Sequence, residues 1–121
     1  NVVVETDLWG GGRRTLVGFE NHSGRTFLGP GCRPLGRVVV GAGNNGEDGL
    51  EGAVYRNAVG TYLHGSLLPK NPRLADWLLA RALERRYGPG AATALTPLDD
   101  AVEERAHLAA IRRARATRRR P

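Results

Sequence analysis

Glycine divides the first half of the chain into short segments and so limits the regular structure that it can form. Of the seventeen glycines among the 121 residues, only Gly88 and Gly90 lie beyond residue 70. Glycine favours tight turns and weakens helix interiors, so this distribution predicts short strands joined by turns rather than a helical bundle. The length corresponds to one domain at most.

Apolar runs between the turns mark the expected strands. The runs 2–5 and 15–19 flank the Gly10-Gly11-Gly12 turn and predict a hairpin. Further strands are expected at 36–40, 53–56 and 59–63, and the last of them leads into His64-Gly65. The segment 41–49 is rich in Gly, Asn and Asp, which tolerate left-handed backbone angles, and predicts a loop.

Beyond residue 70 the pattern becomes helical. Asn71 is expected to cap a helix whose first residue is Pro72 and whose apolar residues recur at helical spacing up to Tyr87. Gly88 and Pro89 then supply the stop signal, which predicts a helix over 72–87.

A second helix is expected to start near Asp99 and Asp100 and to fray into an arginine-rich tail. Its apolar side is predicted to consist of Val102, Ala106 and Ala109, and His107 is expected to be a surface residue.

The net charge of +6 belongs mostly to that tail. Residues 1–100 carry eleven basic and ten acidic side chains, whereas residues 101–121 carry seven arginines and two glutamates. A basic tail can attract polyanions, so a small nucleic-acid-binding module is an alternative function. No aromatic or nucleic-acid-binding motif accompanies the arginines, which favours a solvated, frayed terminus and no nucleic-acid partner.

Two further features bound the location of the protein. No run of about 18 apolar residues is present, so we expect no membrane span. The single cysteine, Cys32, cannot form an internal disulfide, which fits a cytoplasmic protein. The chain contains no methionine and opens directly on Val2-Val3-Val4, so we expect it to be a fragment that starts within a domain.

Three stretches combine polar side chains with glycine at predicted strand ends. They are Gly18 to Thr26, Gly41 to Asn45 with its continuation Glu51 to Asn57, and Gly60 to Gly65. His22 and His64 both fall where a predicted strand gives way to a glycine turn, and polar groups at strand ends often face a ligand crevice in α/β sheets.

The order of these motifs resembles the C-terminal motifs of CobB/CobQ-type glutamine amidotransferases. The matching segments are Gly18-Phe19-Glu20-Asn21-His22, Gly43-Asn44-Asn45, Gly60-Thr61-Tyr62-Leu63-His64-Gly65 and Leu68-Pro69-Lys70-Asn71. Within that group the chain is most similar to the GatD-type subunit of lipid II isoglutaminyl synthase. The Leu68-Pro69-Lys70-Asn71 run favours this subunit, but a cobyric-acid-type amidotransferase stays an alternative.

The resemblance implies an α/β fold, the C-terminal half of a three-layer, flavodoxin-like class I amidotransferase domain with short strands followed by two helices. Residues 1–98 are expected to belong to this domain, whose N-terminal half would carry the nucleophile, and residues 99–121 to form a terminal helix and basic tail.

The resemblance also implies roles for particular residues. His64 would be the catalytic histidine that serves a cysteine nucleophile. Glu20, Asn21 and His22 would lie beside the glutamine substrate, although they could equally tie a strand end to a neighbouring loop. Many class I amidotransferases place an orienting glutamate two residues after the histidine. Ser66 stands there in this chain, as expected for the cobyric-acid-like subgroup.

The remaining implications concern cofactors and partners. No cofactor and no metal site is expected in this chain, whereas ATP and Mg are expected on a partner ligase. The expected partners are L-glutamine and a Mur-ligase-like subunit that forms a heterodimer, with lipid II bound through that subunit.

Cys32 is a weak candidate for the nucleophile. A lone cysteine with a distant histidine can form a catalytic pair. However, no apolar strand leads into Cys32, and Pro34 would obstruct a helix leading out of it. We therefore expect Cys32 to be a loop thiol, and Asn44 and Asn45 to be turn formers.

Overall fold

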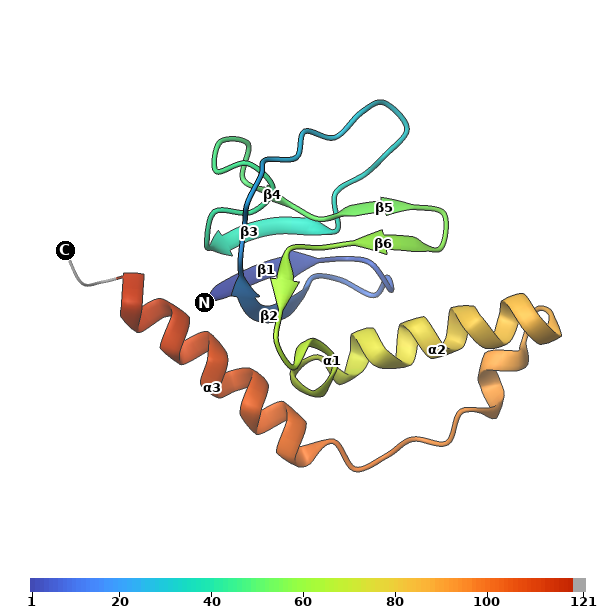
Figure 1. Cartoon of the computed structure of the whole chain (residues 1–121). Helices are drawn as coiled ribbons and strands as arrows, with labels where there is room; N and C mark the ends of the chain where they lie inside the picture. The colour runs from blue at the N-terminus through green and yellow to red at the C-terminus, as the bar shows by residue number, and fades with distance from the viewer. Residues whose placement is uncertain (119–121) are drawn as a thin grey trace.

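The computed structural model describes residues 1–118, which form a small α/β unit (Figure 1). Its strands are β1 (Val2–Thr6), β2 (Arg14–Glu20), β3 (Gly36–Val40), β4 (Leu50–Glu51), β5 (Ala53–Tyr55), β6 (Ala58–Gly60) and β7 (Leu63–His64). Its helices are α1 (Leu67–Lys70), α2 (Pro72–Tyr87), the 3-10 turn η1 (Ala91–Ala94) and α3 (Ala101–Arg118). None of the helices within these residues is long and apolar enough to cross a lipid bilayer.

The main sheet has five strands in the order β4-β3-β1-β2-β7, and each of these neighbouring pairs is antiparallel. The predicted hairpin is confirmed, because Val3 pairs with Val17 across β1 and β2. The predicted strand 36–40 is confirmed as β3. Strands β5 and β6 form a separate two-stranded ribbon.

The prediction of one strand over 59–63 is wrong. The chain leaves the ribbon after β6 and joins the edge of the main sheet as β7, where Leu63 pairs with Glu20. Thr61 and Tyr62 lie between the two strands, and both donate hydrogen bonds to the carboxyl group of Glu51. These contacts with a buried side chain replace strand pairing at that point.

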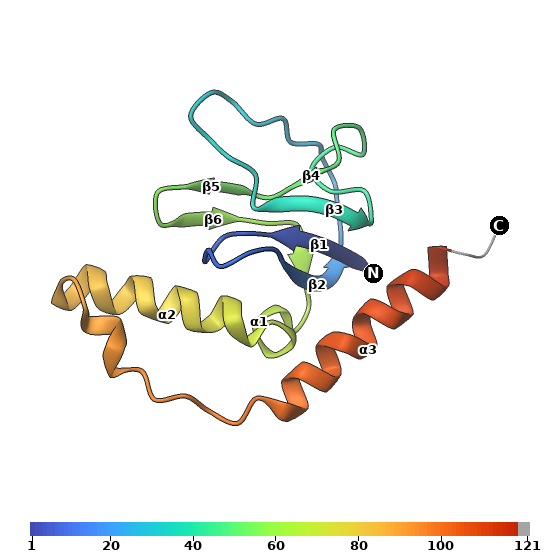
Figure 2. The same ribbon diagram turned by 180° about the vertical axis from the view of Figure 1, so that it is seen from behind.

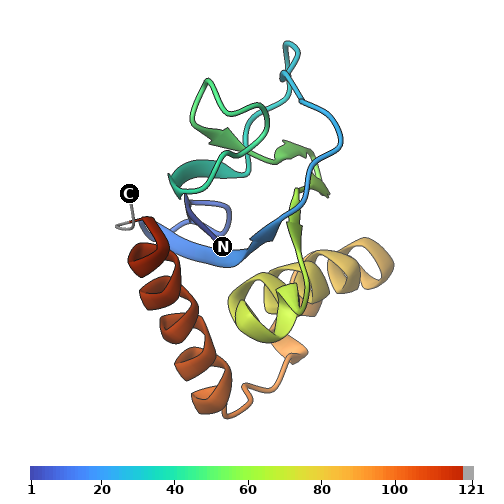
Figure 3. The ribbon, with the colours of Figure 1, turned by 60° about the vertical axis from the view of Figure 1, so that its left-hand side comes forward.

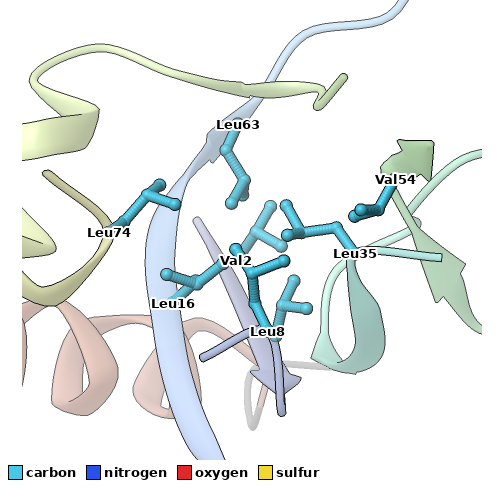
Figure 4. Close-up of a cluster of buried hydrophobic side chains, with 8 residues drawn as sticks. Val2, Leu8, Leu16, Leu35, Val54, Leu63 and Leu74 are labelled. Carbon is cyan, nitrogen blue, oxygen red and sulfur yellow. The ribbon is translucent and has the colours of Figure 1, made fainter. Parts of the chain in front are cut away.

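One face of the sheet packs against α2 and the β5–β6 ribbon. Side chains alternate along a strand, so Val2 and Val4 point to this face. Leu16, Leu63 and Leu74 join them in a cluster to which Leu35 and Val54 also belong (Figure 4). The cluster fixes the end of β7 relative to the beginning of α2.

The opposite face is covered by α3, which lies across the sheet near the N-terminus (Figure 3). Val3, Val17 and Val40 are buried there together with Ala114, and Ala110 and Ile111 pack against them. The predicted apolar side of this helix is therefore wrong, because Val102 is 63% exposed and Ala109 is exposed. The spacing of apolar residues in α3 did not show which of its side chains would pack against the sheet.

Two further expectations about this helix are corrected. It continues regularly to Arg118, whose guanidinium donates to the carbonyl of Val39, instead of fraying. His107 is half-buried, because its ring nitrogens bond Thr15 Oγ1 and the carbonyl of Lys70, both at 2.7 Å. Arg119 and Arg120 lie outside the described residues.

Helix α2 has the predicted bounds of 72–87, and it extends away from the sheet (Figure 2). Asn71 is the N-cap residue, as predicted, but its side chain makes no cap hydrogen bond. Its amide instead bonds the backbone N–H and carbonyl of Val17, both at 2.8 Å. Asn71 is buried against β2, so its side chain cannot also reach the first turn of the helix.

Candidate functional site

His64 ends β7 at the edge of the main sheet, opposite Phe19 of β2. Its side chain is exposed, and its ring centroid lies 5.9 Å from that of Phe19. Gly65 turns the chain away with φ 59°, and a Cβ atom at this position would overlap the Phe19 ring. Glycine thus allows the strand to end against Phe19 with the imidazole facing solvent.

The His64 ring is oriented by the backbone two residues earlier. Its Nδ1 lies 2.6 Å from the carbonyl oxygen of Tyr62. A carbonyl oxygen can only accept a hydrogen bond, so Nδ1 carries the proton. In the neutral ring Nε2 then holds an unprotonated lone pair, which is the arrangement that a general base needs.

Glu20 links the end of β2 to the 41–49 loop. Its carboxylate accepts hydrogen bonds from the N–H groups of Ala42 at 2.6 Å and Gly43 at 2.9 Å, and from His22 Nε2 at 3.1 Å. Burial alone would raise the pKa of Glu20, but these donors together hold that pKa below its ordinary value. The ionised Glu20 therefore holds the 41–49 loop against the end of β2.

His22 and His64 both contact Tyr62, one through its ring and the other through its backbone carbonyl. The His22 ring lies against the Tyr62 ring with centroids 4.2 Å apart, and the Tyr62 hydroxyl bonds Thr26 Oγ1 at 2.7 Å. The backbone of Tyr62 holds His64, as described above. The structure thus brings Glu20, His22 and His64 into one connected group, whereas the side chain of Asn21 is exposed beside it.

Sequence reasoning assigned no role to Glu51, which is fully buried in this region. Its carboxyl group accepts hydrogen bonds from the Tyr62 N–H at 2.6 Å and from Thr61 Oγ1 at 3.0 Å. Burial raises the pKa of Glu51. The sequence around Glu51 gives no signal that singles it out, because the acidic residues Glu47 and Asp48 lie close before it.

Asn44 and Asn45 lie in a turn, as expected, and their side chains also bond the backbone. Asn44 exchanges two hydrogen bonds with the backbone of Gly52, and Asn45 accepts from the N–H groups of Glu47 and Asp48. Both are buried, so their amides shape the loop that delivers Ala42 and Gly43 to Glu20.

The surface beside these residues is open. A hollow of about 200 Å³ is lined by His22, Arg25 and the loop segment 42–46. A hollow of about 510 Å³ shares Ala42 and Gly46 with it, and another of about 300 Å³ lies by Glu5 and Arg33. His64 lines none of these three hollows. No group of three or more metal-ligating side chains occurs among residues 1–118. Glu20, His22 and His64 thus place a base and hydrogen-bonding side chains at the β7 edge of the main sheet.

Residues 1–72 match the family of CobB/CobQ-like glutamine amidotransferase domains. This chain belongs to that family. The match covers more than half of the chain and includes Glu20, His22, Glu51 and His64.

Curated relatives of this amidotransferase-family chain carry two kinds of name. Lipid II isoglutaminyl synthase (glutamine-hydrolyzing) subunit GatD from Staphylococcus aureus (strain N315) is 51% identical over 89 residues, which are 74% of this chain and 34% of the relative. The protein of the same name from Streptococcus pneumoniae (strain ATCC BAA-255 / R6) is 51% identical over 74 residues, or 61% and 28% of the two chains. A cobyric acid synthase from Pelotomaculum thermopropionicum is 50% identical over 87 residues, or 62% and 16%. The chain spans about a third of the length of the first of these relatives.

The lone thiol of this amidotransferase-family chain lies in a different part of the fold. Cys32 Sγ is 3.7 Å from the carbonyl of Val54 on β5, in the separate ribbon. The backbone of the adjacent Arg33 forms an isolated antiparallel β-bridge with Val54. His64 instead belongs to the edge strand of the main sheet, so the contacts of Cys32 give it no link to the imidazole.

Proposed function

We propose that this chain is the histidine-bearing part of a glutamine amidotransferase, and that His64 is the general base and acid for a cysteine outside these 121 residues. The exposed ring with Nδ1–H bound to the Tyr62 carbonyl is the observation that carries the proposal. It leaves Nε2 free to exchange a proton with a thiol, and the family membership supplies the reaction class.

The reaction proceeds in two halves. Nε2 of His64 takes the thiol proton while the sulfur attacks the side-chain amide carbon of glutamine. The imidazolium then returns this proton to the leaving nitrogen, so that ammonia departs and a γ-glutamyl thioester remains. In the second half, His64 deprotonates water, which attacks the thioester. Glutamate is released, and the proton returns to the thiolate.

Glu20, Asn21 and His22 are assigned to the glutamine-binding side of this site. The contact of His22 with Tyr62 supports their place next to His64. Both oxygens of Glu20 already accept hydrogen bonds from the 41–49 loop, so we assign Glu20 to shaping the pocket wall. The proposed complete domain is the three-layer, flavodoxin-like domain of class I amidotransferases.

The proposed whole protein is the glutamine-hydrolysing subunit of a lipid II isoglutaminyl synthase. The names of the Staphylococcus and Streptococcus relatives support this assignment. Ammonia would pass to a Mur-ligase-like subunit in a cytoplasmic heterodimer, and that subunit would use ATP and Mg to amidate D-glutamate of lipid II. A cobyric-acid-type amidotransferase is the second candidate, because cobyric acid synthases match at 49–50% identity.

Ammonia release from glutamine by the full-length protein tests the reaction. His64→Ala should lower kcat by roughly 10²–10⁴-fold, which is the usual contribution of a general acid and base. Glu47→Gln, a change at an exposed carboxylate, is the matched control and should leave kcat unchanged. Equal hydrolysis by wild type and His64→Ala would refute the proposal.

A second assay separates the two acceptors. The full-length protein is combined with a Mur-ligase-like subunit, ATP, Mg and glutamine, and either lipid II or a cobyrinate is added. Amidation of lipid II alone supports the first candidate, and amidation of the corrinoid alone supports the second.

A further inference from the structure

Glu51 occupies a position that connects a buried carboxyl group to the exposed His64. It lies on β4, the strand at the other edge of the main sheet from β7. Its contacts with Thr61 and Tyr62 fall in the short segment between β6 and β7. This segment determines where β7 begins and how it approaches His64.

A chain of hydrogen bonds extends the influence of Glu51 to the carbonyl that holds the imidazole. Thr61 Oγ1 donates to Glu51 and accepts from the N–H of Leu63 at 3.0 Å. The Leu63 N–H and the Tyr62 carbonyl belong to one peptide group, which is planar. Fixing this N–H therefore fixes the direction of the carbonyl oxygen that binds His64 Nδ1.

Glu51 also holds the other side of Tyr62, because it accepts the Tyr62 N–H directly at 2.6 Å. The peptide groups before and after Tyr62 are thus both restrained, one by Glu51 and one by Thr61. Linked hydrogen bonds of this kind strengthen one another in a water-poor environment. Apart from the His64 ring itself, no other side chain among residues 1–118 bonds these two peptide groups.

We propose that Glu51 is a positioning residue for His64, acting through Thr61 and the Tyr62–Leu63 peptide to keep Nδ1 protonated and Nε2 free. The catalytic consequence rests on the proposed function, whereas the effect on the imidazole does not. Ser66, two residues after His64, is exposed, and its hydroxyl makes no hydrogen bond to the ring. The orienting group therefore acts from another strand and through the backbone.

The proposed role requires hydrogen-bonding capacity at Glu51 and not its negative charge. Burial raises the pKa of this carboxyl group, which favours its neutral form. A glutamine could accept the Tyr62 N–H with its carbonyl and donate to Thr61 Oγ1 with its NH₂ group. Leucine, of similar size, would leave the Tyr62 N–H without an acceptor.

The tautomer of His64 is the direct readout, measured by ¹⁵N NMR of the imidazole in the full-length protein, with His64→Ala used to assign the signals. Wild type should show the Nδ1–H form. Glu51→Leu should move the population toward the Nε2–H form, and Glu51→Gln should restore the wild-type pattern. Tyr62→Phe removes only the hydroxyl and keeps the carbonyl, so it is a control that should retain the Nδ1–H form.

Thr61→Val provides a second arm, because it removes the hydroxyl that joins Glu51 to the Leu63 N–H but leaves the Glu51 carboxyl group and its bond from the Tyr62 N–H in place. It should also raise the Nε2–H population, and it decides the matter if Glu51→Leu does not fold. An unchanged tautomer in folded Glu51→Leu, or in Thr61→Val where Glu51→Leu does not fold, would overturn the proposal. So would an Nε2–H form in the wild type.

The kinetics of glutamine hydrolysis then test whether the orientation of His64 affects catalysis. Glu51→Leu should lower kcat for glutamine hydrolysis by about 10–100-fold, less than complete loss of the base, with a smaller change in KM. Glu51→Gln should stay near wild type. If wild type and His64→Ala hydrolyse glutamine equally, the proposed function fails, but the tautomer measurements still test the positioning role. A tautomer shift without any fall in kcat would overturn the catalytic part alone.

Discussion

The strand region, residues 1–64, and the helical region, residues 67–118, are held in place by different interactions. The strand region buries polar side chains that pair with the backbone, among them Asn44, Asn45 and Glu51. In the long helices only Pro72, Leu74 and Ala114 are buried. The helices are therefore attached to the sheet by few buried side chains and by single hydrogen-bonding residues such as Asn71 and His107. The strand region combines most of the apolar core with a dense set of directional hydrogen bonds from buried polar side chains.

This difference explains why the candidate site lies in the strand region. An imidazole that exchanges protons must keep a defined orientation, and hydrogen bonds from buried groups provide one. Apolar packing is non-directional and contributes mainly stability. The comparison predicts that substitutions in the helices change stability, whereas substitutions around Tyr62 also change the chemistry of His64.

The largest expected effect on stability is at Leu74, the buried anchor of α2. Leu74→Ala should lower the free energy of unfolding by about 2–5 kcal/mol, because it removes apolar contacts and leaves a cavity. Leu79 on the same helix is 53% exposed, so Leu79→Ala should cost less than about 1 kcal/mol. Urea denaturation measures both. Equal losses would show that the far part of α2 is also anchored.

The next effect concerns the polar loop. Asn44→Ala leaves the buried N–H and carbonyl of Gly52 without their partners and should cost about 2–3 kcal/mol. The exposed Asn57 in the β5–β6 turn is the matched control, and Asn57→Ala should change stability by less than about 0.5 kcal/mol. A small loss at Asn44 would contradict the view that buried amides specify this region.

A smaller effect is expected where α3 meets β2 and α1. His107→Ala removes the bonds to Thr15 and to the Lys70 carbonyl and should cost about 1–2 kcal/mol. Hydrogen exchange should accelerate in α3 more than in the sheet. Arg105 is exposed and lies two residues before His107 on the same helix, so Arg105→Ala serves as the control. Exchange that is unaltered in His107→Ala would show that the apolar contacts alone hold the helix.

The smallest effects are expected in the pH dependence of stability, and they have opposite signs at two carboxyl groups. The pKa of Glu20 is lowered in the fold, so its contribution is present above the unfolded value of about 4.3 and is lost as the pH falls through the folded value. The pKa of Glu51 is raised, so its contribution is present below about 4.3 and is lost as the pH rises through the folded value.

Urea denaturation between pH 3 and 7 measures both contributions. The cost of Glu20→Gln should shrink toward low pH, whereas the stability of Glu51→Gln relative to wild type should increase toward neutral pH. Curves that stay parallel to wild type would contradict both assignments.

Local signals were enough to predict several elements. Gly10-Gly11-Gly12 identified the first hairpin, and Pro72 with Gly88 gave the bounds of α2, because proline and glycine act on the backbone of their own neighbourhood. His64 was placed correctly at a strand end before a glycine turn. These features depend on residues that are adjacent in the sequence.

Features that depend on distant partners were missed. Asn71 pairs with Val17 and His107 bonds Thr15, contacts between residues 54 and 92 positions apart. The role of Glu51 depends on a segment ten residues away that folds back over it. No local pattern distinguishes such residues from solvent-exposed ones, because burial is decided by the whole sheet.

The distance from His64 Nε2 to the reacting cysteine sulfur tests the central claim most directly. It can be measured in a crystal structure of the full-length protein after reaction with a glutamine analogue that traps the nucleophile. The account predicts that Nε2 lies within hydrogen-bonding reach of that sulfur, about 3–4 Å, with Nδ1 still on the Tyr62 carbonyl. A trapped sulfur remote from His64, or one belonging to Cys32, would contradict it.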